Sequence, residues 1–342
     1  NCTVRIYGDI SNVVAVGVAV SGFDGDESVE INNTVVAVAH ACAVESRADS
    51  AAVAVGVMVW SEFGSAVVRV SNATIAASHR CTVTYRVRIG NAAAAVGMAS
   101  TAPQFHHLQV NATAIAAVDT STVEIISRLC VGAAAVGITA RSNNGDNIVD
   151  VSNTTMMATH TCAVRSSGDV AISAVGIAVY SDGGAGVRVV DTTMVATHRT
   201  VVTSNGSACV AAVGIISRAS LFNHVSVVNV TMGVSHGVVV ASVGTSSIMV
   251  AVGVNVWTDG SASVSTLDTT MAVAYNSSVD SRSDWENAAV AIIVRSRQAG
   301  AVSVVNTTML AAFNCTVTSR SVFTAASFGV AFFTSSNATL RI

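Results

Sequence analysis

Hydrophobic and polar residues alternate in short stretches of the chain, most clearly between residues 82 and 89. The apolar members Val83, Tyr85, Val87 and Ile89 are interleaved with Thr82, Thr84, Arg86 and Arg88. A period of two with charges on one side is typical of a β-strand with one wet face. We therefore expect a core lined by valines such as Val55, Val57, Val83 and Val87.

The alternating segments are separated by clusters of Gly, Asn, Asp and Ser, which are turn residues. No stretch shows a convincing helical period. The pattern predicts an all-β chain with almost no helix.

The tripeptide Ala-Val-Gly or a close variant returns along the whole chain at intervals of 36 to 41 residues. Its glycine stands at Gly17, Gly56, Gly97, Gly137, Gly176, Gly214, Gly253 and Gly329, and the best match for the eighth repeat puts Ile293 in the glycine place. A period of this length with small changes is the signature of stacked structural repeats.

The fold predicted from this period is a parallel β-helix, or β-solenoid, of about eight to nine repeats. Because the coils of parallel β-helices are usually shorter than 39 residues, we expect two coils per repeat and a length of roughly 80 Å; one large coil per repeat, giving roughly 40 Å, is the alternative. The period crosses every candidate boundary, so residues 1–342 are interpreted as one domain, expected to be a segment of a longer chain.

Composition narrows the function classes. The chain has no lysine and a formal net charge of −3, so no basic stripe for nucleic acid is available. The apolar stretch 238–256 carries the same repeat landmarks as its neighbours and is interpreted as solenoid, not as a membrane span. No feature indicates a cofactor.

A first column of equivalent positions is an Asx-x-Thr corner. Its Asn or Asp residues are Asn32, Asn72, Asn111, Asn153, Asp191, Asn229, Asp268 and Asn306, each followed two residues later by Thr. Asn and Asp tolerate the left-handed bend of a corner and bond to nearby backbone. Thr also follows Asp191 and Asp268, where no glycan can attach, so we interpret the column as structural in the first place.

The chain also contains eleven N-glycosylation sequons. Their asparagines are Asn1, Asn32, Asn72, Asn111, Asn153, Asn205, Asn229, Asn276, Asn306, Asn314 and Asn337. This density predicts a secreted or cell-surface glycoprotein, with glycans expected first at sequons outside the corner column, such as Asn205 and Asn276.

A second column is His-x-Cys: His40 with Cys42, His79 with Cys81 and His160 with Cys162, continuing as His198, His236, Tyr275 and Phe313 with Cys315. Because Tyr and Phe replace His, we predict a stack of flat rings. Structural zinc needs four converging ligands, which residues on separate coils do not supply, so no metal site is predicted. The seven cysteines are expected to be mainly buried free thiols.

A third column is the small-residue face of the Ala-Val-Gly strand. Its members are Ala15, Gly17, Ala54, Gly56, Ala95, Gly97, Ala135, Gly137, Ala174, Gly176, Ala212, Gly214, Ala251 and Gly253, with Ala291 assigned to the eighth repeat. If the valines point inward, this uncharged face points away from them and needs a cover. The cover is either another layer of the same chain or another molecule, and the second case predicts assembly.

The loop after this strand varies most. Asp24, Asp26 and Glu27 form an acidic group there that could attract calcium, but acidic residues do not recur together in the other repeats. Turn chemistry explains these loops sufficiently.

The lysine-free, Val/Ala/Ser-rich style, with recurrent AVGVAV, NTTM and HAC or HRC segments, resembles the long repetitive surface proteins of kinetoplastid protists, including the dispersed gene family. The resemblance covers the whole chain and implies a β-helical, glycosylated surface protein with an adhesive role.

Three functions are compatible with these patterns. The first is a non-enzymatic extracellular structural or adhesive solenoid that assembles laterally or end to end through the Ala/Gly face. The second is a carbohydrate-active enzyme of the pectin-lyase-like kind, for which the carboxylates are too scattered. The third is an ice- or mineral-binding face, for which only Thr82 with Thr84 and Thr316 with Thr318 supply the expected pattern.

Overall fold

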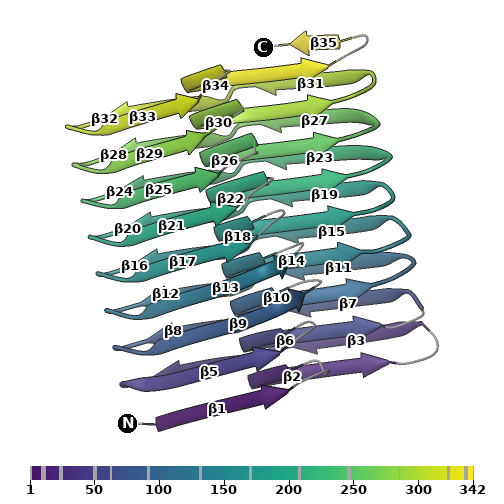
Figure 1. The fold of residues 1–342 in the computed structure, drawn as a ribbon, viewed down its shortest axis with the longest axis vertical. Coiled ribbons are helices and arrows are strands. Elements are labelled where there is room, and N and C mark those ends of the chain that lie inside the picture. The colour runs from purple at the N-terminus through teal and green to yellow at the C-terminus, as the bar shows by residue number, and fades with distance from the viewer. Residues whose placement is uncertain are drawn as a thin grey trace.

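The computed structural model of the protein describes residues 2–8, 13–22, 26–48, 52–61, 64–90, 93–130, 133–168, 172–206, 209–244, 248–284, 286–321, 324–334 and 338–341. Within these ranges the regular structure consists of strands, without a helix. The strands stack coil on coil into a parallel β-solenoid (Figure 1). Nine strands spaced about 4.8 Å apart in a sheet correspond to a length of about 40 Å.

In the described residues, each of the first eight coils contributes one strand to each of four parallel sheets, and the last coil contributes to three of them. We name the sheets A to D in chain order. Sheet A consists of β1 (Cys2–Gly8), β5 (Cys42–Ala48), β9 (Thr82–Gly90), β13 (Thr122–Cys130), β17 (Ala163–Gly168), β21 (Val201–Gly206), β25 (Val239–Gly244), β29 (Ser278–Ser283) and β33 (Thr316–Ser321). Sheet B consists of β2 (Val13–Gly22), β6 (Ala52–Ser61), β10 (Ala93–Ala102), β14 (Ala133–Ser142), β18 (Ile172–Ser181), β22 (Cys209–Ala219), β26 (Ile248–Thr258), β30 (Glu286–Ser296) and β34 (Thr324–Thr334).

Sheet C consists of β3 (Glu27–Asn32), β7 (Ala66–Ser71), β11 (His106–Asn111), β15 (Asn147–Ser152), β19 (Ala185–Val190), β23 (Phe222–Val228), β27 (Ser261–Leu267), β31 (Gly300–Val305) and β35 (Ala338–Arg341). Sheet D consists of β4 (Val35–Ala39), β8 (Thr74–Ser78), β12 (Ala114–Val118), β16 (Thr155–Thr159), β20 (Thr193–Thr197), β24 (Thr231–Ser235), β28 (Thr270–Ala274) and β32 (Thr308–Ala312).

One repeat is one coil, so the expectation of two coils per repeat is wrong. Gly56 pairs directly with Gly97 of the next repeat, and Gly97 pairs with Gly137. The repeat is long because it carries four strands instead of filling two smaller turns. The pairing also places Ala291, not Ile293, opposite Gly253. The irregular intervals of 40 and 36 residues thereby become 38 and 38, since 253 to 291 and 291 to 329 are equal steps.

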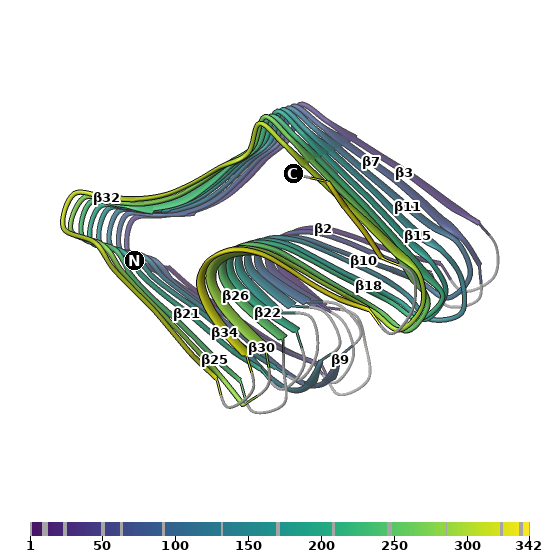
Figure 2. The same ribbon diagram turned by 90° about the horizontal axis from the view of Figure 1, so that it is seen from above.

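Sheet B is strongly bent and lies inside the coil, between sheets A and C (Figure 2). The bend has a local cause in the Ala-Val-Gly segment. The ladder between β10 and β14 pairs Ala94 with Ala134 and Val96 with Val136, and it passes over Ala95 and its equivalent Ala135 on both strands. Gly97 follows with φ of 147°, a conformation that only glycine adopts readily.

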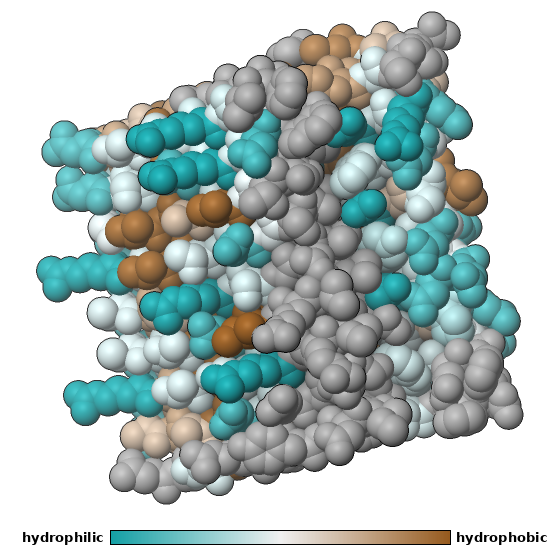
Figure 3. Space-filling view, viewed as in Figure 1, coloured by the Kyte–Doolittle hydropathy of each residue, from teal (hydrophilic) through white to brown (hydrophobic). Residues whose placement is uncertain are grey.

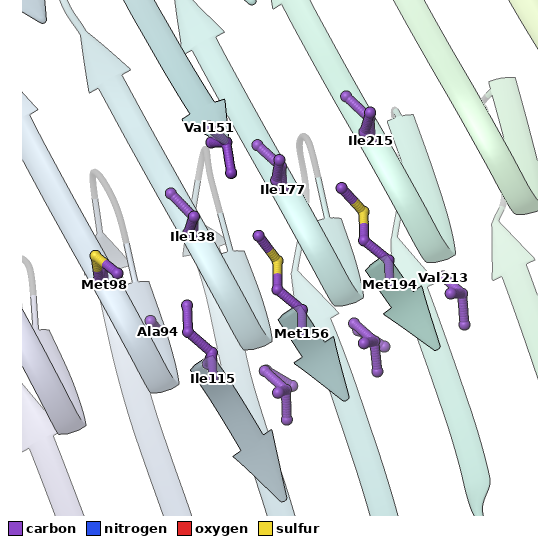
Figure 4. Close-up of a cluster of buried hydrophobic side chains, with 14 of the residues drawn as sticks. Ala94, Met98, Ile115, Ile138, Val151, Met156, Ile177, Met194, Val213 and Ile215 are labelled. Carbon is purple, nitrogen blue, oxygen red and sulfur yellow. The ribbon is translucent and has the colours of Figure 1, made fainter. Parts of the chain in front are cut away.

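The core is formed by columns of aliphatic side chains from the facing sheets. In Figure 4 the sheet B column, with Met98, Ile138 and Ile177, lies beside the sheet D column, with Ile115 and Met156. All five are at most 1% exposed. The methionine of the recurrent NTTM segment is therefore a core residue.

The predicted alternation is confirmed where it is described. Val55, Val57 and Val83 are buried, and Thr82 and Arg86 are exposed on the other face. The side chain of Val87 lies outside the described part of the chain.

The outer faces of the sheets differ in charge. Sheet A shows both signs toward solvent, for example Glu45 and Arg86, and Figure 3 shows hydrophilic and hydrophobic side chains mixed over its strands. Sheet C also carries both signs, for example Glu30 and Arg69. The eight strands of sheet D contain no Asp, Glu, Lys or Arg.

Candidate functional site

The Ala/Gly column is enclosed by the chain itself. In the second to seventh repeats its alanines are fully buried and its glycines are buried as well, while Ala15 and Gly17 of the first coil keep some exposure. Of the two covers that the sequence allowed, the structure shows the first, another layer of the same chain.

The alanines of the column point into the core, whereas the sequence predicted that they point away from it. The column alanines belong to the same hydrophobic core as Val55 and Val57. The unpaired residue in the bend breaks the simple alternation, so the alanine and the valine after it both face the core. The eighth member of this column is Ala289, because Ala291 occupies the glycine position.

The glycines of the column are required by close contact between coils. A Cβ atom on Gly137 would lie 1.9 Å from the carbonyl oxygen of Gly176, and φ at Gly137 is 153°. The same contact recurs along sheet B. These glycines therefore allow the bent strands to stack.

The Asx corner joins sheets C and D, and its left-handed conformation is confirmed. Asn72, Asn153, Asp191, Asn229, Asp268 and Asn306 all have φ between 47° and 53°. In two repeats the prediction is wrong by one residue: the left-handed positions are Asn33 and Ala112, because Asn32 and Asn111 are the last residues of β3 and β11.

Side-chain bonds connect this corner from coil to coil. Asn229 Nδ2 donates to Asp191 Oδ1 at 2.7 Å, and Asn306 Nδ2 donates to Asp268 Oδ1 at 2.5 Å. Within a coil, the threonine after the corner residue donates to the carbonyl two residues earlier: Thr154 Oγ1 bonds Ser152 O at 2.9 Å. The Asn and Asp positions of the column thus have a structural reason that does not involve a glycan.

The nine described sequon asparagines are all exposed: Asn32, Asn72, Asn111, Asn153, Asn205, Asn229, Asn276, Asn306 and Asn314. Asn1 and Asn337 lie outside the described residues. Asn205 belongs to strand β21, and Asn276 lies in the turn between sheets D and A, with φ of 56°.

The His-x-Cys column forms the corner between sheets D and A, and the ring stack is confirmed. His160, His198, His236, Tyr275 and Phe313 stack in sequence, with centroids 4.6 to 4.8 Å apart. His40 and His79 stack separately at 4.8 Å. Both residues of each turn are left-handed, for example His160 and Thr161, as in a tight two-residue turn.

An acidic residue that the sequence reading missed interrupts this stack. Asp119 stands at the ring position of the third coil and lies 3.4 Å from His79 Nε2 and 3.9 Å from His160 Nδ1. Counting one period from His79 would have located it. These residues do not converge on an ion: in the described part of the chain, no group of three or more His, Cys, Asp or Glu side chains is placed to hold a metal.

The cysteines of the column close the turn. Cys81 Sγ and Cys162 Sγ donate to the carbonyls three residues earlier, at 2.8 and 2.9 Å, and Ser121 and Ser277 do the same with hydroxyls. Burial raises the pKa of the Cys162 thiol, so the thiol stays protonated as a donor. Cys81, Cys162 and Cys315 are free, as expected, but Cys42 is disulfide-bonded, which the sequence reading did not predict.

The acidic loop considered for calcium acts as a turn where it is described. Asp26 Oδ1 accepts a hydrogen bond from Ser65 N of the next coil at 3.0 Å. In the corresponding loop of a later repeat, Asp146 Oδ1 accepts one from Gly184 N at 2.8 Å. Asp24 lies outside the described residues, and Glu27 begins strand β3.

Arginine and aromatic side chains alternate along sheet B near its junction with sheet C and form a ladder. This ladder was not predicted from the sequence. Arg218 lies over the rings of Tyr180 and Trp257, at 5.7 and 4.0 Å from the centroids. Arg141 and Arg295 flank the same rings at 5.4 and 5.7 Å. The signal was available, because each of these residues stands four positions after the column glycine or its Ala291 replacement.

Tyr180 is half-buried in this ladder, and its hydroxyl donates a hydrogen bond to Asp182 Oδ1 at 2.6 Å. Burial and this carboxylate raise the pKa of Tyr180 to about 12. The tyrosine therefore stays protonated and acts as a hydrogen-bond donor.

A buried polar network with catalytic residue types lies between sheets B and C. Ser100 Oγ is 2.5 Å from His106 Nε2, and His106 Nδ1 is 2.8 Å from Asn147 Oδ1. Asn147 Nδ2 donates to Tyr180 O, so its Oδ1 accepts the Nδ1 proton and Nε2 accepts from Ser100. All three side chains are at most 2% exposed, so this Ser-His-Asn array is closed to substrate and acts in packing.

Comparison with protein-family models, with curated proteins and with solved structures finds no significant match for this chain. The part of the chain that the structure describes contains no helix that could span a membrane.

Proposed function

We propose that the protein is a non-enzymatic structural or adhesive β-solenoid of the cell exterior. The observation that carries the proposal is the repetition of the outer surface: the Asx corner and sheet D present similar residues in coil after coil, and the rings stack on both sides of Asp119. Such rows suit many weak, repeated contacts along the axis and not one ligand in one pocket.

Two further observations favour the cell exterior. Disulfides persist mainly in oxidising compartments, and Cys42 is disulfide-bonded. The nine described sequon asparagines are all exposed, which leaves them accessible to carry glycans. A surface role is also what the resemblance to the repetitive kinetoplastid proteins implies.

Localisation tests this proposal directly. Antibodies raised against the folded chain should label intact cells of the source organism without permeabilisation, and enzymatic removal of N-glycans should increase the electrophoretic mobility of the native protein. Labelling that needs permeabilisation, together with unchanged mobility, would contradict the proposal.

The enzymatic alternative has a separate test. Purified protein is incubated with acidic and neutral polysaccharides, and new reducing ends and unsaturated products are measured. We expect no turnover above a boiled control; saturable product formation would favour the pectin-lyase-like alternative.

A further inference from the structure

We infer that sheet D is the surface through which two copies of the chain associate. This inference builds on the structural role proposed above and replaces the Ala/Gly face, which the chain itself covers. The sheet D surface is defined here by the outward residues at the first and third positions of its eight strands.

The surface has a regular composition. The first-position row is Val35, Thr74, Ala114, Thr155, Thr193, Thr231, Thr270 and Thr308, in pairing order. The third-position row is Ala37, Ala76, Ala116, Met157, Val195, Gly233, Ala272 and Leu310. Val35 is 73% exposed and Leu310 is 45% exposed, so apolar side chains reach solvent at both ends of the sheet.

Charge distinguishes sheet D from its neighbours. The outward faces of sheets A and C carry acidic and basic side chains, whereas sheet D carries none. Removing charges from water costs several kcal/mol per ion unless they are well paired, and sheet D avoids that cost. An uncharged surface is therefore the one that a second copy covers most readily.

The dimensions meet the requirement for a specific contact. Eight strands spaced about 4.8 Å apart, each with five residues of about 3.3 Å, span about 34 Å by about 17 Å. Two such faces would bury about 1,100 Å² in total, just above the ~1,000 Å² expected of a biological interface. The contact is thus predicted to be reversible and concentration-dependent.

Two-fold symmetry can lay the third-position row of one copy on the same row of a second copy. A two-fold axis that lies in the interface, parallel to the strands and between β16 and β20, places Met157 opposite Val195 of the second copy. The same operation places Ala116 opposite Gly233 and the large Leu310 opposite the small Ala37. Leu310 thus meets a small residue, and none of these pairs brings a charge into the contact.

Charge reversal tests the surface. Ala76 and Ala272 face each other in this arrangement, and both are partly exposed. The double variant Ala76→Glu with Ala272→Glu places like charges opposite each other, and so does Ala76→Arg with Ala272→Arg. Each variant alone should associate at least about a hundredfold more weakly than wild type, whereas an equimolar mixture should regain association.

Sedimentation velocity across the micromolar range measures the association. A matched control, Ala163→Glu with Ala241→Glu on the outer face of sheet A, should associate like wild type. Circular dichroism and the melting temperature verify that every variant is folded. A monomeric wild type, or Glu variants that associate as strongly as wild type, would overturn the inference and leave the localisation and glycan tests unaffected.

Discussion

Acid should weaken the fold through one residue, His106. Its imidazole is fully buried between Ser100 and Asn147. Burial, opposed by the hydrogen bond to Asn147, lowers the pKa of His106 from 6.5 to about 4. In the folded protein the ring is therefore neutral at all pH values above about 4.

The sign of the effect follows from the difference between the two states. Below pH ~6.5 the unfolded chain protonates this histidine, whereas the folded chain does not until pH ~4. The free energy of unfolding consequently falls as the pH is lowered from about 6.5 to about 4 and then levels off. The difference in pKa corresponds to about 3 kcal/mol.

The variant His106→Asn isolates this contribution. The equivalent position is Asn147 in the next coil and Asn223 two coils further, so the site accepts asparagine. At pH 7 the variant should be less stable than wild type by about 1 to 3 kcal/mol, because the buried Ser100 hydroxyl loses its partner.

Urea unfolding at several pH values between 7 and 4 gives the difference in stability between the two proteins. All other ionisable groups are the same in both proteins, so their contributions cancel in this difference. We expect the advantage of wild type to shrink by about 3 kcal/mol and to vanish or reverse near pH 4. A difference that is constant over this range would refute a neutral, buried His106.

Three further sets of substitutions test the backbone of the coil. Gly137→Ala should lower the free energy of unfolding by at least about 3 kcal/mol in a urea titration, because its Cβ would lie 1.9 Å from Gly176 O. The control Gly186→Ala, whose Cβ would have its nearest atom at 3.9 Å, should stay within about 1 kcal/mol of wild type, and equal losses would contradict the contact. Ala112→Asn should raise the melting temperature and stabilise the fold by about 1 kcal/mol, since Ala112 has φ of 48° at a position that asparagine tolerates better; a lower melting temperature would speak against strain at this corner. Asn153→Asp should melt close to the wild-type temperature, whereas Asn153→Val should lose about 1 to 3 kcal/mol of stability, because a β-branched residue is disfavoured at φ of 48°. Equal melting temperatures of the two variants would indicate that the Asx-x-Thr column exists for glycans.

The features that recur in every repeat were predictable from the sequence. Alternation placed Val83 inside and Arg86 outside, and the period of the glycines predicted a parallel solenoid. The drift from His236 to Tyr275 and Phe313 predicted the ring stack. In each case many equivalent positions repeat the same physical requirement.

Features that depend on register were not predictable in the same way. A 39-residue repeat can fill two coils or one coil of four sheets, and only the pairing decides between them. Ala95 is the position that the ladder skips in the bend, and this break in the alternation turns its side chain toward the core. The corner at Ala112 was missed because the sequon asparagine Asn111 is one residue away from the left-handed position.

Single occurrences form a third group. A histidine occupies the His106 position in one repeat only, so no recurring pattern predicts its hydrogen bonds to Ser100 and Asn147. The Arg-aromatic ladder, in contrast, could have been found by comparing the positions four residues after each column glycine. Its alternation of Arg and aromatic side chains is regular from Arg141 to Arg295.

Because one repeat is one coil, equivalent residues of successive repeats lie directly above one another in every column of the fold. Spin labels placed through unnatural amino acids at Val35 and Thr308 report on this stacking, because both occupy the first-position row of sheet D and are exposed. The labels are seven coil steps apart. Double electron–electron resonance on labelled protein diluted with unlabelled protein should give a distance near ~34 Å, whereas a distance near ~67 Å would mean two coils per repeat and would contradict the account.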